Sequence, residues 1–291
     1  MQWSFRRRKM FKLLYTNKNG QSIELYGAPF HLSKVEGIGD VESENQVQKA
    51  PYQDGSTFLD VILSERHISI ELTIKANDKE QLSERRQFFS SVFNPKLGEG
   101  TLRYINGSII REIKAIADGV PYYPDGSGNR SARSQKTMLN LFCPNPYWRS
   151  TSITEEPAFE PRFRFPIRGP FIMGIQRDRR VINNDGDAPA PLLVEFFGPA
   201  LNPKIINNTT GEYIRIRQEL LEGERMMIDT SDSTVYFIDA EGIERNVFPW
   251  IDMSSTFFKL VVGSNDIEYN ADSDIQGTMV NISYSKLYNA V

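Results

Sequence analysis

The sequence is poor in the residues that disulfides and transition-metal sites require. Its 291 residues include one cysteine, Cys143, and two histidines, His31 and His67. A single cysteine excludes an intramolecular disulfide framework, and two isolated histidines leave a zinc site almost without ligands. Cys143 follows the apolar run 138–142, which favours an inert buried thiol over a reactive one. We therefore predict no metal site and no bound cofactor.

Long apolar runs and a strong charge of one sign are also lacking. No apolar stretch approaches the roughly 20 residues of a membrane span. The 34 basic and 37 acidic residues give a formal net charge of -3, so no global field favours nucleic acid or an anionic membrane. At residues 6–9 a basic cluster predicts a solvated or partner-facing segment rather than a nucleic-acid site. Because the first 20 residues hold no apolar signal-peptide core, we expect a chain made in the cytoplasm and kept there until it assembles.

Strand and turn signals, by contrast, are abundant in the first half. Residues 11–16 and 21–26 flank Asn17-Lys18-Asn19-Gly20, and residues 100–104 and 109–117 flank Asn106-Gly107, so each pair predicts a β-hairpin. Further strands are expected at residues 30–35 and 134–142. Between them, residues 36–56 are polar and show little periodicity, which predicts a long loop or arm.

One strand and one helix are marked clearly by periodicity. Within residues 58–76, apolar residues alternate with polar ones, as in a half-buried strand: Ile68, Ile70, Leu72 and Ile74. Residues 78–93 then carry apolar residues at helical spacing, from the N-cap signal Asn77-Asp78 to the stop signal Asn94-Pro95. We predict that residues 1–144 form a small β-sheet or barrel domain with this one helix.

The second half contains short strands and no long helix. Two prolines in the run Pro144-Asn145-Pro146-Tyr147-Trp148 interrupt the preceding strand, which places a second domain at residues 145–291. Its expected strands are 171–175, 179–183, 192–197, 203–207, 213–217, 225–229, 234–238, 257–262, 267–271 and 278–284. A spacing of about 8 to 12 residues between short strands is typical of a β-sandwich or jelly roll. The predicted fold class is therefore mainly β in both domains.

Two prolines also bear on where one of these strands lies. Pro189 and Pro191 directly precede the expected strand 192–197, after the turn-forming run Asn183-Asn184-Asp185-Gly186-Asp187. Because proline cannot donate a hydrogen bond to a sheet, we expect this strand to begin at a sheet edge or at a corner.

Carboxylates near two turns raise the question of a glycosidase. Asp229 and Asp232 lie in one such segment, and Asp239 and Glu241 lie in another. A pair of facing carboxylates could hydrolyse a glycosidic bond. However, all four stand where a β-hairpin needs turn formers, and the pattern fixes no separation between them. We favour the turn interpretation and predict no catalytic residue.

Two other groups of polar residues are candidates for a metal site or a catalytic site. Asp266, Asp272 and Asp274 offer oxygen ligands for calcium, but they lack the spacing of a calcium loop and its downstream glutamate. His67 follows Arg66 with no evident partner base or nucleophile. The chain also has no glycine-rich phosphate loop before a helix and no nucleophile elbow. We predict that the protein is not an enzyme.

Aromatic residues leave an alternative open. Tyrosine and tryptophan side chains could stack on sugar rings if several converged on one face, and the candidates are Trp148, Tyr213, Tyr236, Trp250 and Tyr269. Core packing is the commoner use of such residues, above all for Trp250 after Phe248-Pro249. A carbohydrate-binding adhesin module that recognises host cell-wall glycans is thus the alternative to a purely structural protein.

The order of these signals resembles the distal tail protein family of siphophages and related prophages. The residues that carry the resemblance span most of the chain and are densest in the second half: Asn145-Pro146-Tyr147-Trp148, Asn183-Asn184-Asp185-Gly186-Asp187, Pro191, Gly198, Asn202-Pro203, Asn207-Asn208-Thr209-Thr210-Gly211, Gly223-Glu224, Ile228-Asp229-Thr230, Leu260, Gly263-Ser264-Asn265 and Tyr284. The basic residues 6–9 match nothing in the family pattern.

This resemblance implies a structural virion protein at the tail tip. Proteins of this family form a hexameric ring, or baseplate hub, through the N-terminal domain, with a galectin-like β-sandwich as the C-terminal domain. The implied partners are the major tail tube protein on one ring face and the tail-associated spike or lysin on the other. A receptor-binding protein or a host glycan is a further implied partner of the outer domain. Residues 36–56 and the helix 78–93 would help to join neighbouring subunits.

Overall fold

The computed structural model describes residues 11–155, 178–272 and 279–291, and the chain divides into two compact units. Unit 1 comprises Met1–Thr151 and Tyr288–Val291, and unit 2 comprises Ser152–Leu287. The sequence places the domain boundary at residues 144 and 145, whereas the contacts divide the chain after Thr151. Trp148 lies in the hydrophobic core of unit 1.

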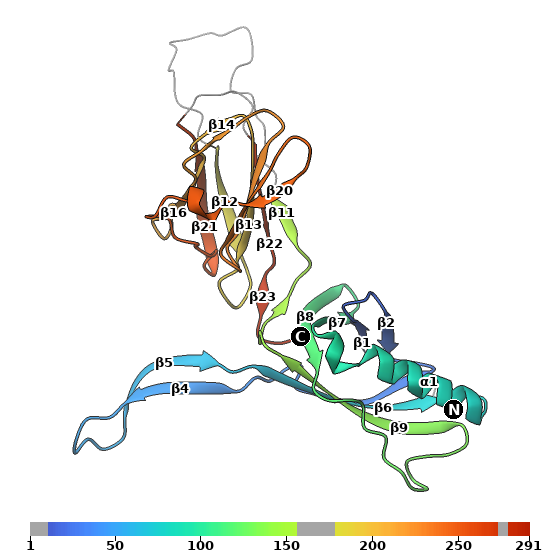
Figure 1. The fold of residues 1–291 in the computed structure, drawn as a ribbon. Helices are drawn as coiled ribbons and strands as arrows, with labels where there is room; N and C mark the ends of the chain where they lie inside the picture. The colour runs from blue at the N-terminus through green and yellow to red at the C-terminus, as the bar shows by residue number, and fades with distance from the viewer. Residues whose placement is uncertain (1–10, 156–177, 273–278) are drawn as a thin grey trace, which may run out of the picture. The chain divides into compact units, whose positions relative to one another are not determined.

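Unit 1 is built on a nine-stranded antiparallel sheet (Figure 1). Its main path runs β2-β1-β7-β8-β9-β6-β3, and β10 pairs with β8 and with β23 at the C-terminus. The strands are β1 (Lys12–Thr16), β2 (Ser22–Leu25), β3 (Phe30–Glu36), β6 (Arg66–Lys75), β7 (Gly100–Asn106), β8 (Ile109–Ala117), β9 (Ser134–Cys143), β10 (Trp148–Arg149) and β23 (Leu287–Tyr288). Both predicted hairpins are confirmed, because β1 pairs with β2 and β7 pairs with β8.

The core of unit 1 lies between this sheet and a single α-helix. On β6 the predicted alternation is confirmed, since Ile68, Ile70, Leu72 and Ile74 are buried. The helix α1 (Lys79–Val92) begins where the Asp78 side chain accepts a hydrogen bond from the Gln81 backbone N–H at 2.8 Å, as the N-cap signal predicts. Its buried residues Leu82, Phe89 and Val92 join the sheet residues in one cluster. A short 3-10 helix, η1 (Pro95–Leu97), follows.

Between β3 and β6 the chain forms a separate two-stranded ribbon, β4 (Ser43–Gln48) and β5 (Thr57–Leu63) (Figure 1). The sequence predicts a loop or arm over 36–56 and one run of strand over 58–76. Instead, β4 occupies part of the first segment, and Ser64 and Glu65 divide the second into β5 and β6. The polar residues of β4 carry no alternation, and they form a strand because β5 supplies their backbone hydrogen bonds.

Unit 2 is a β-sandwich in which two antiparallel sheets share one hydrophobic core. The six-stranded sheet has the order β11-β22-β13-β18-β19-β20, and the four-stranded sheet has the order β12-β21-β15-β16. Their bounds are β11 (Ile153–Glu155), β12 (Asp178–Asn184), β13 (Leu192–Phe197), β15 (Lys204–Asn207), β16 (Glu212–Arg215), β18 (Arg225–Asp229), β19 (Thr234–Ile238), β20 (Glu244–Asn246), β21 (Gly263–Asn270) and β22 (Met279–Tyr284). A small pair, β14 (Ala200–Leu201) and β17 (Glu219–Leu220), and the 3-10 helix η2 (Phe248–Trp250) complete the unit.

For β13 the edge alternative is wrong, and the expected strand at residues 257–262 is also wrong. The strand after Pro189 and Pro191, β13, lies in the sheet interior between β22 and β18. This is possible because the prolines precede the strand, and Ala190 between them exchanges backbone hydrogen bonds with Leu260 instead. Residues 257–262 form no strand, because Leu260 alone among them makes a bridge. The expected strand 171–175 lies outside the described residues.

Candidate interaction sites

The carboxylates considered for a glycosidase do not meet. Asp229 ends β18, and Asp239 follows β19, whose last residue Ile238 pairs with the first residue of β18. The two groups therefore lie at opposite ends of one hairpin. Each satisfies its own turn, because Asp229 Oδ1 accepts from the Ser231 N–H at 2.7 Å and Asp239 Oδ1 accepts from the Ile243 N–H at 2.8 Å. This arrangement supports the turn interpretation.

The aspartates considered for calcium are engaged by arginines instead. The Arg179 Nε donates to Asp266 Oδ1 at 2.7 Å, and this bond holds the pKa of the Asp266 carboxyl below its usual value. Asp272 accepts from the Asn202 amide at 2.8 Å and from Arg215, and these partners likewise lower its pKa. Asp274 lies outside the described residues. Within the described residues, no group of three or more His, Cys, Asp and Glu side chains is placed to hold a metal ion.

The remaining polar candidates have structural surroundings. Cys143 is buried, and the loss of hydration raises the pKa of its thiol to about 12, so the thiolate is scarce at neutral pH. His67 is exposed on the outer face of β6, where its ring lies 5.5 Å from the Phe142 ring. Neither residue is placed with a nucleophile or base among the described residues.

The five aromatic residues considered for sugar stacking do not form one platform. Trp148 is fully buried in unit 1, where its indole N–H donates to the Ile38 carbonyl at 3.0 Å. Tyr269 is buried against Phe196 in unit 2. Tyr213 and Tyr236 lie half-buried on β16 and β19, which belong to different sheets.

Trp250 lines a pocket. This pocket of about 200 Å³ lies in unit 2 and is bordered by Gln218, Glu219, Leu221, Glu224, Phe237, Arg245 and Trp250. The Arg245 guanidinium lies 4.7 Å from the centre of the Phe237 ring and 5.5 Å from that of Trp250. A half-buried aromatic ring beside amide and carboxylate groups is the chemistry that sugar sites use.

The ribbon of β4 and β5, which we call the arm, carries large apolar side chains in solvent. Phe58 is 63% exposed, Ile62 is 55% exposed and Val47 is 53% exposed. Tyr52, between the strands, is fully exposed. A two-stranded hairpin is marginally stable in water, and an exposed apolar surface of this kind marks a place where another chain binds. The sequence signal for it is the apolar run 58–63, which only Asp60 interrupts and which lacks the alternation of a half-buried strand.

The register gives the arm two different faces. Asn45 pairs with Val61, and Val47 pairs with Phe58 after a register shift between Gln46 and Val47, so one face is largely apolar. On the other face Glu44 pairs with Ile62, and Gln46 pairs with Asp60. Residues 42–63 hold four acidic residues and one lysine, so the arm is acidic as well as apolar.

At its base the arm is anchored to the sheet of unit 1. The Arg66 guanidinium, 1% exposed, donates to the carbonyl oxygens of Gly37 at 2.9 Å and Asp40 at 2.7 Å, just before β4. It also donates to the Pro146 and Asn289 carbonyls. Gly37 has a φ of 84°, and a Cβ there would lie 1.9 Å from the His67 carbonyl oxygen. The direction in which the chain leaves β3 is therefore fixed by backbone contacts that only glycine permits.

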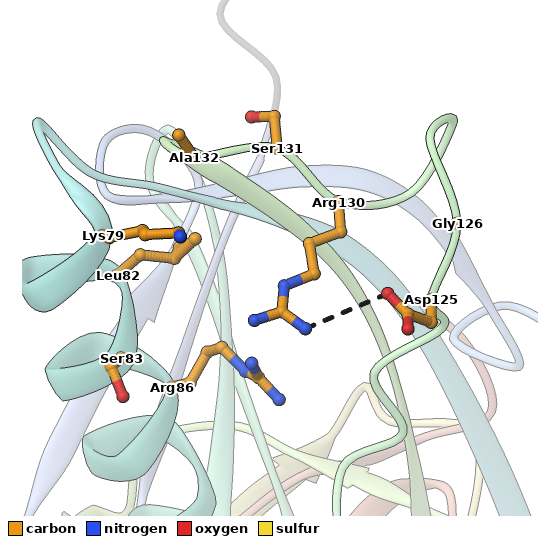
Figure 2. Close-up of a pocket in the computed structure, with 9 residues that line it drawn as sticks. All are labelled: Lys79, Leu82, Ser83, Arg86, Asp125, Gly126, Arg130, Ser131 and Ala132. Atoms are coloured by element: carbon orange, nitrogen blue, oxygen red, sulfur yellow. Dashed lines mark ion pairs between the residues drawn. The ribbon is translucent and has the colours of Figure 1, made fainter.

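A second pocket in unit 1 lies between α1 and residues 125–132, with a volume of about 460 Å³ (Figure 2). Its lining residues are Lys79, Leu82, Ser83, Arg86, Asp125, Gly126, Arg130, Ser131 and Ala132. Figure 2 shows the side chains of Lys79 and Arg86 reaching from α1 towards Arg130 on the opposite wall. The pocket thus has three cationic residues and one acidic residue, which places a local positive charge on a chain that is negative overall.

Among the helices of the described residues, none has the length and apolar character that a membrane span requires. The longest is α1, which has 14 residues.

Both family models that match this chain describe components of phage tails. Residues 185–288 match the model of the siphovirus-type tail component, C-terminal domain, and residues 18–143 match the model of the phage tail protein RIFT-related domain. No curated protein sequence matches the chain significantly.

Solved structures with a similar fold cover nearly the whole chain. The Dit protein (gp 19.1) of SPP1, described as a paradigm of the hub adsorption apparatus in phages that infect Gram-positive bacteria, is similar with a TM-score of 0.67. The two are 13% identical, and the match covers 96% of this chain and 99% of that one. A chain of the phage P2 baseplate in its activated conformation with Ca has a TM-score of 0.60 at 11% identity, covering 97% and 100%. The Sr form of that baseplate gives 0.58 at 10% identity, with the same coverage.

Proposed function

Because the chain belongs to the siphophage distal tail protein family, whose members are structural parts of the phage tail and baseplate, we propose that it forms a hexameric ring at the tail tip. In this ring unit 1 makes the contacts between subunits, and unit 2, a galectin-like sandwich, faces outward. One ring face binds the major tail tube protein, and the other binds the tail-associated spike or lysin. The mature location is the virion, after synthesis in the host cytoplasm.

The observation that carries this proposal is the exposed arm. It pairs with no other strand of the described residues and presents Val47, Phe58 and Ile62 to solvent. A hairpin that buries so little of its own apolar surface gains its stability from a partner. A neighbouring copy of the same chain is the partner that a ring always supplies.

An exposed arm is compatible with the cyclic symmetry of a ring. In a cyclic assembly each subunit uses one surface to bind a different surface of the next subunit, and the ring closes when the rotation between them returns to the start. The arm is one such surface, and the complementary one lies elsewhere on unit 1. A two-fold dimer, in contrast, would bring the two arms against each other.

Light scattering coupled to size-exclusion chromatography tests the ring. We expect a species of six chains, with rings visible by negative-stain microscopy, and we expect a variant with residues 43–63 replaced by a short Gly-Ser linker to remain monomeric. A full-length protein that stays monomeric at about 100 µM would contradict the proposal, because obligate ring interfaces are stable well below that concentration. A pull-down tests whether the two ring faces bind their proposed partners. The assembled ring should retain the tube and spike proteins that the same phage genome encodes.

The Trp250 pocket supports a second candidate function, the binding of host cell-wall glycans by unit 2. Gln218 and Glu219 line this pocket beside the half-buried Trp250. Glycan arrays and cell-wall pulldown test it, and Gln218→Ala with Glu219→Ala should abolish binding without disturbing the core. Trp250→Ala is a poorer test, since this ring also packs against Phe237 at 5.4 Å.

A further inference from the structure

We propose that the acidic face of the arm of one copy binds the basic α1 pocket of the next copy, through carboxylates held by Lys79, Arg86 and Arg130. This proposal rests on the ring proposed above and names the two surfaces that would meet in it. Each surface is incomplete alone, because the pocket has an excess of cations and the arm has an excess of carboxylates.

The pocket has cations without acidic partners. Lys79 and Arg86 form no salt bridge with any acidic side chain of the described residues. Asp125 is the one acidic residue of the lining, and it lies 3.9 Å from Arg130, at the edge of ion-pair distance (Figure 2). Two of the three positive charges are therefore available to an incoming anion.

Other residues fix the orientation of the Arg86 side chain before an anion binds. Its guanidinium lies 4.5 Å from the centre of the Tyr123 ring, and the Tyr123 hydroxyl donates to the Arg86 carbonyl at 3.0 Å. The Arg86 Nε is buried and has no hydrogen-bond partner among the described residues. Stacking on a tyrosine fixes the plane of the guanidinium, so less side-chain entropy is lost when a carboxylate binds to its free edge.

The arm offers carboxylates in a matching form. Glu44 and Asp60 lie on the same face of the ribbon, on neighbouring strands, and both are exposed. Neither forms a salt bridge with a described cation. Strands in a ribbon are about 4.8 Å apart, so two carboxylates on one face can reach two or three cations across one pocket. The opposite, apolar face of the arm remains free to pack on other parts of the neighbour.

An alternative occupant of a basic pocket is a free anion such as phosphate. We favour the arm because its net charge is opposite to that of the pocket, both surfaces lie on one chain, and the exposed Ile62 on the acidic face would also be buried by the contact. A surface and its complement at separate places on one subunit are what a closed ring requires.

Charge reversal tests the contact in the full-length protein. Lys79→Glu with Arg130→Glu changes the pocket and leaves the stacked Arg86 in place, and Glu44→Lys with Asp60→Lys changes the arm. We expect each double variant to raise the concentration of half-assembly by about tenfold, measured by light scattering across a dilution series. Combining all four changes in one chain should restore assembly to near the wild-type value, because the charges are exchanged rather than lost.

Two matched controls separate this contact from general charge effects. Lys18→Glu and Glu241→Lys change exposed charges in turns outside the arm and pocket, and both should assemble as the wild type does. Circular dichroism and thermal melting establish that every variant is folded. Rings that form equally well in all variants would overturn the contact and leave the ring standing, whereas a wild-type protein that never assembles would overturn both.

A cross-link locates the contact directly. Ser83→Cys lies on the pocket rim and Gln46→Cys lies on the acidic face of the arm, and the native Cys143 is buried and unreactive. When the two single variants are mixed and oxidised, we expect a disulfide-linked dimer of one chain of each kind. Gln46→Cys mixed with Lys18→Cys provides the control. No cross-link above that control, or one that 10 mM phosphate abolishes at constant ionic strength, would contradict the proposal.

Discussion

The consecutive strands β5 and β6 contain five and four large apolar residues, respectively, and have opposite environments. In β6, Ile68, Ile70, Leu72 and Ile74 are all buried at 1% exposure or less, whereas in β5 Phe58 is 63% exposed. The difference comes from what surrounds each strand. β6 lies between β3 and β9 and is covered by α1, while β5 pairs with β4 alone. A high apolar content thus indicates that a strand must be buried by other residues. The tertiary structure determines whether those residues belong to the same chain or to another.

Amide hydrogen exchange should show the largest contrast between the two strands. In the monomer at low concentration, we expect the amides of β6 to be protected by about 10⁴-fold or more and those of β4 and β5 by about 100-fold or less, because the arm opens without unfolding the core. At ring-forming concentrations the protection of the arm should rise. Equal protection of β5 and β6 in the monomer would show that the arm is covered by its own chain.

Truncation of a buried phenylalanine tests how much α1 contributes to the core of unit 1. Phe89 is fully buried, with its ring 5.5 Å from Phe30 and 4.7 Å from Phe93. Phe89→Ala should lower the free energy of unfolding by about 3–5 kcal/mol, since it removes apolar burial and leaves a cavity. Urea denaturation followed by circular dichroism measures this change. A loss below about 1 kcal/mol would mean that α1 does not seal the core of unit 1.

Arg66 connects the base of the arm to the sheet of unit 1. Its substitution should have the next largest effect on the free energy of unfolding. Its guanidinium satisfies four carbonyl oxygens, two of them at the base of the arm. Arg66→Met should cost about 3 kcal/mol in unfolding free energy, because the buried carbonyls lose their donors. Arg66→Lys should recover little of it, since one ammonium cannot reach all four oxygens. Full recovery with lysine would argue that only the positive charge matters.

Phe58→Ala should have the smallest effect on the monomer, about 0.5 kcal/mol or less, because the side chain is already in solvent. Assembly should suffer more, with the concentration of half-assembly raised by about tenfold. Ile243→Ala provides the control, since Ile243 is 64% exposed in a turn of unit 2. If Phe58→Ala destabilised the monomer as strongly as Phe89→Ala, the arm would belong to the core.

Sequence patterns predicted well wherever a segment is stabilised by its neighbours in the chain. The helix α1 agrees with its caps to within one residue at each end, because the Asp78 cap and the stop signal act locally. Both hairpins of unit 1 follow from their Asn and Gly turns. The alternation in β6 identified its buried face, since it depends only on which side of a sheet is covered.

Long-range contacts account for the features that the patterns did not predict. β4 is a strand because β5 pairs with it, and β13 lies in a sheet interior because β22 and β18 pair with its two edges. The pocket at α1 brings Lys79 and Arg86 against Arg130, which is more than 40 residues away along the chain. No local signal distinguishes such cations from ordinary solvated ones.

The mainly β fold, the helix α1, the turns and the order of motifs that resembles distal tail proteins could all be inferred from the sequence. These features depend on local backbone preferences and on the periodicity of apolar residues, which are written along the chain. The pairing of residues 43–63 into a ribbon with an apolar and an acidic face became apparent in the folded structure alone, as did the meeting of three cations beside α1. Both depend on strand register and on packing between distant segments, whose energies no single segment contains.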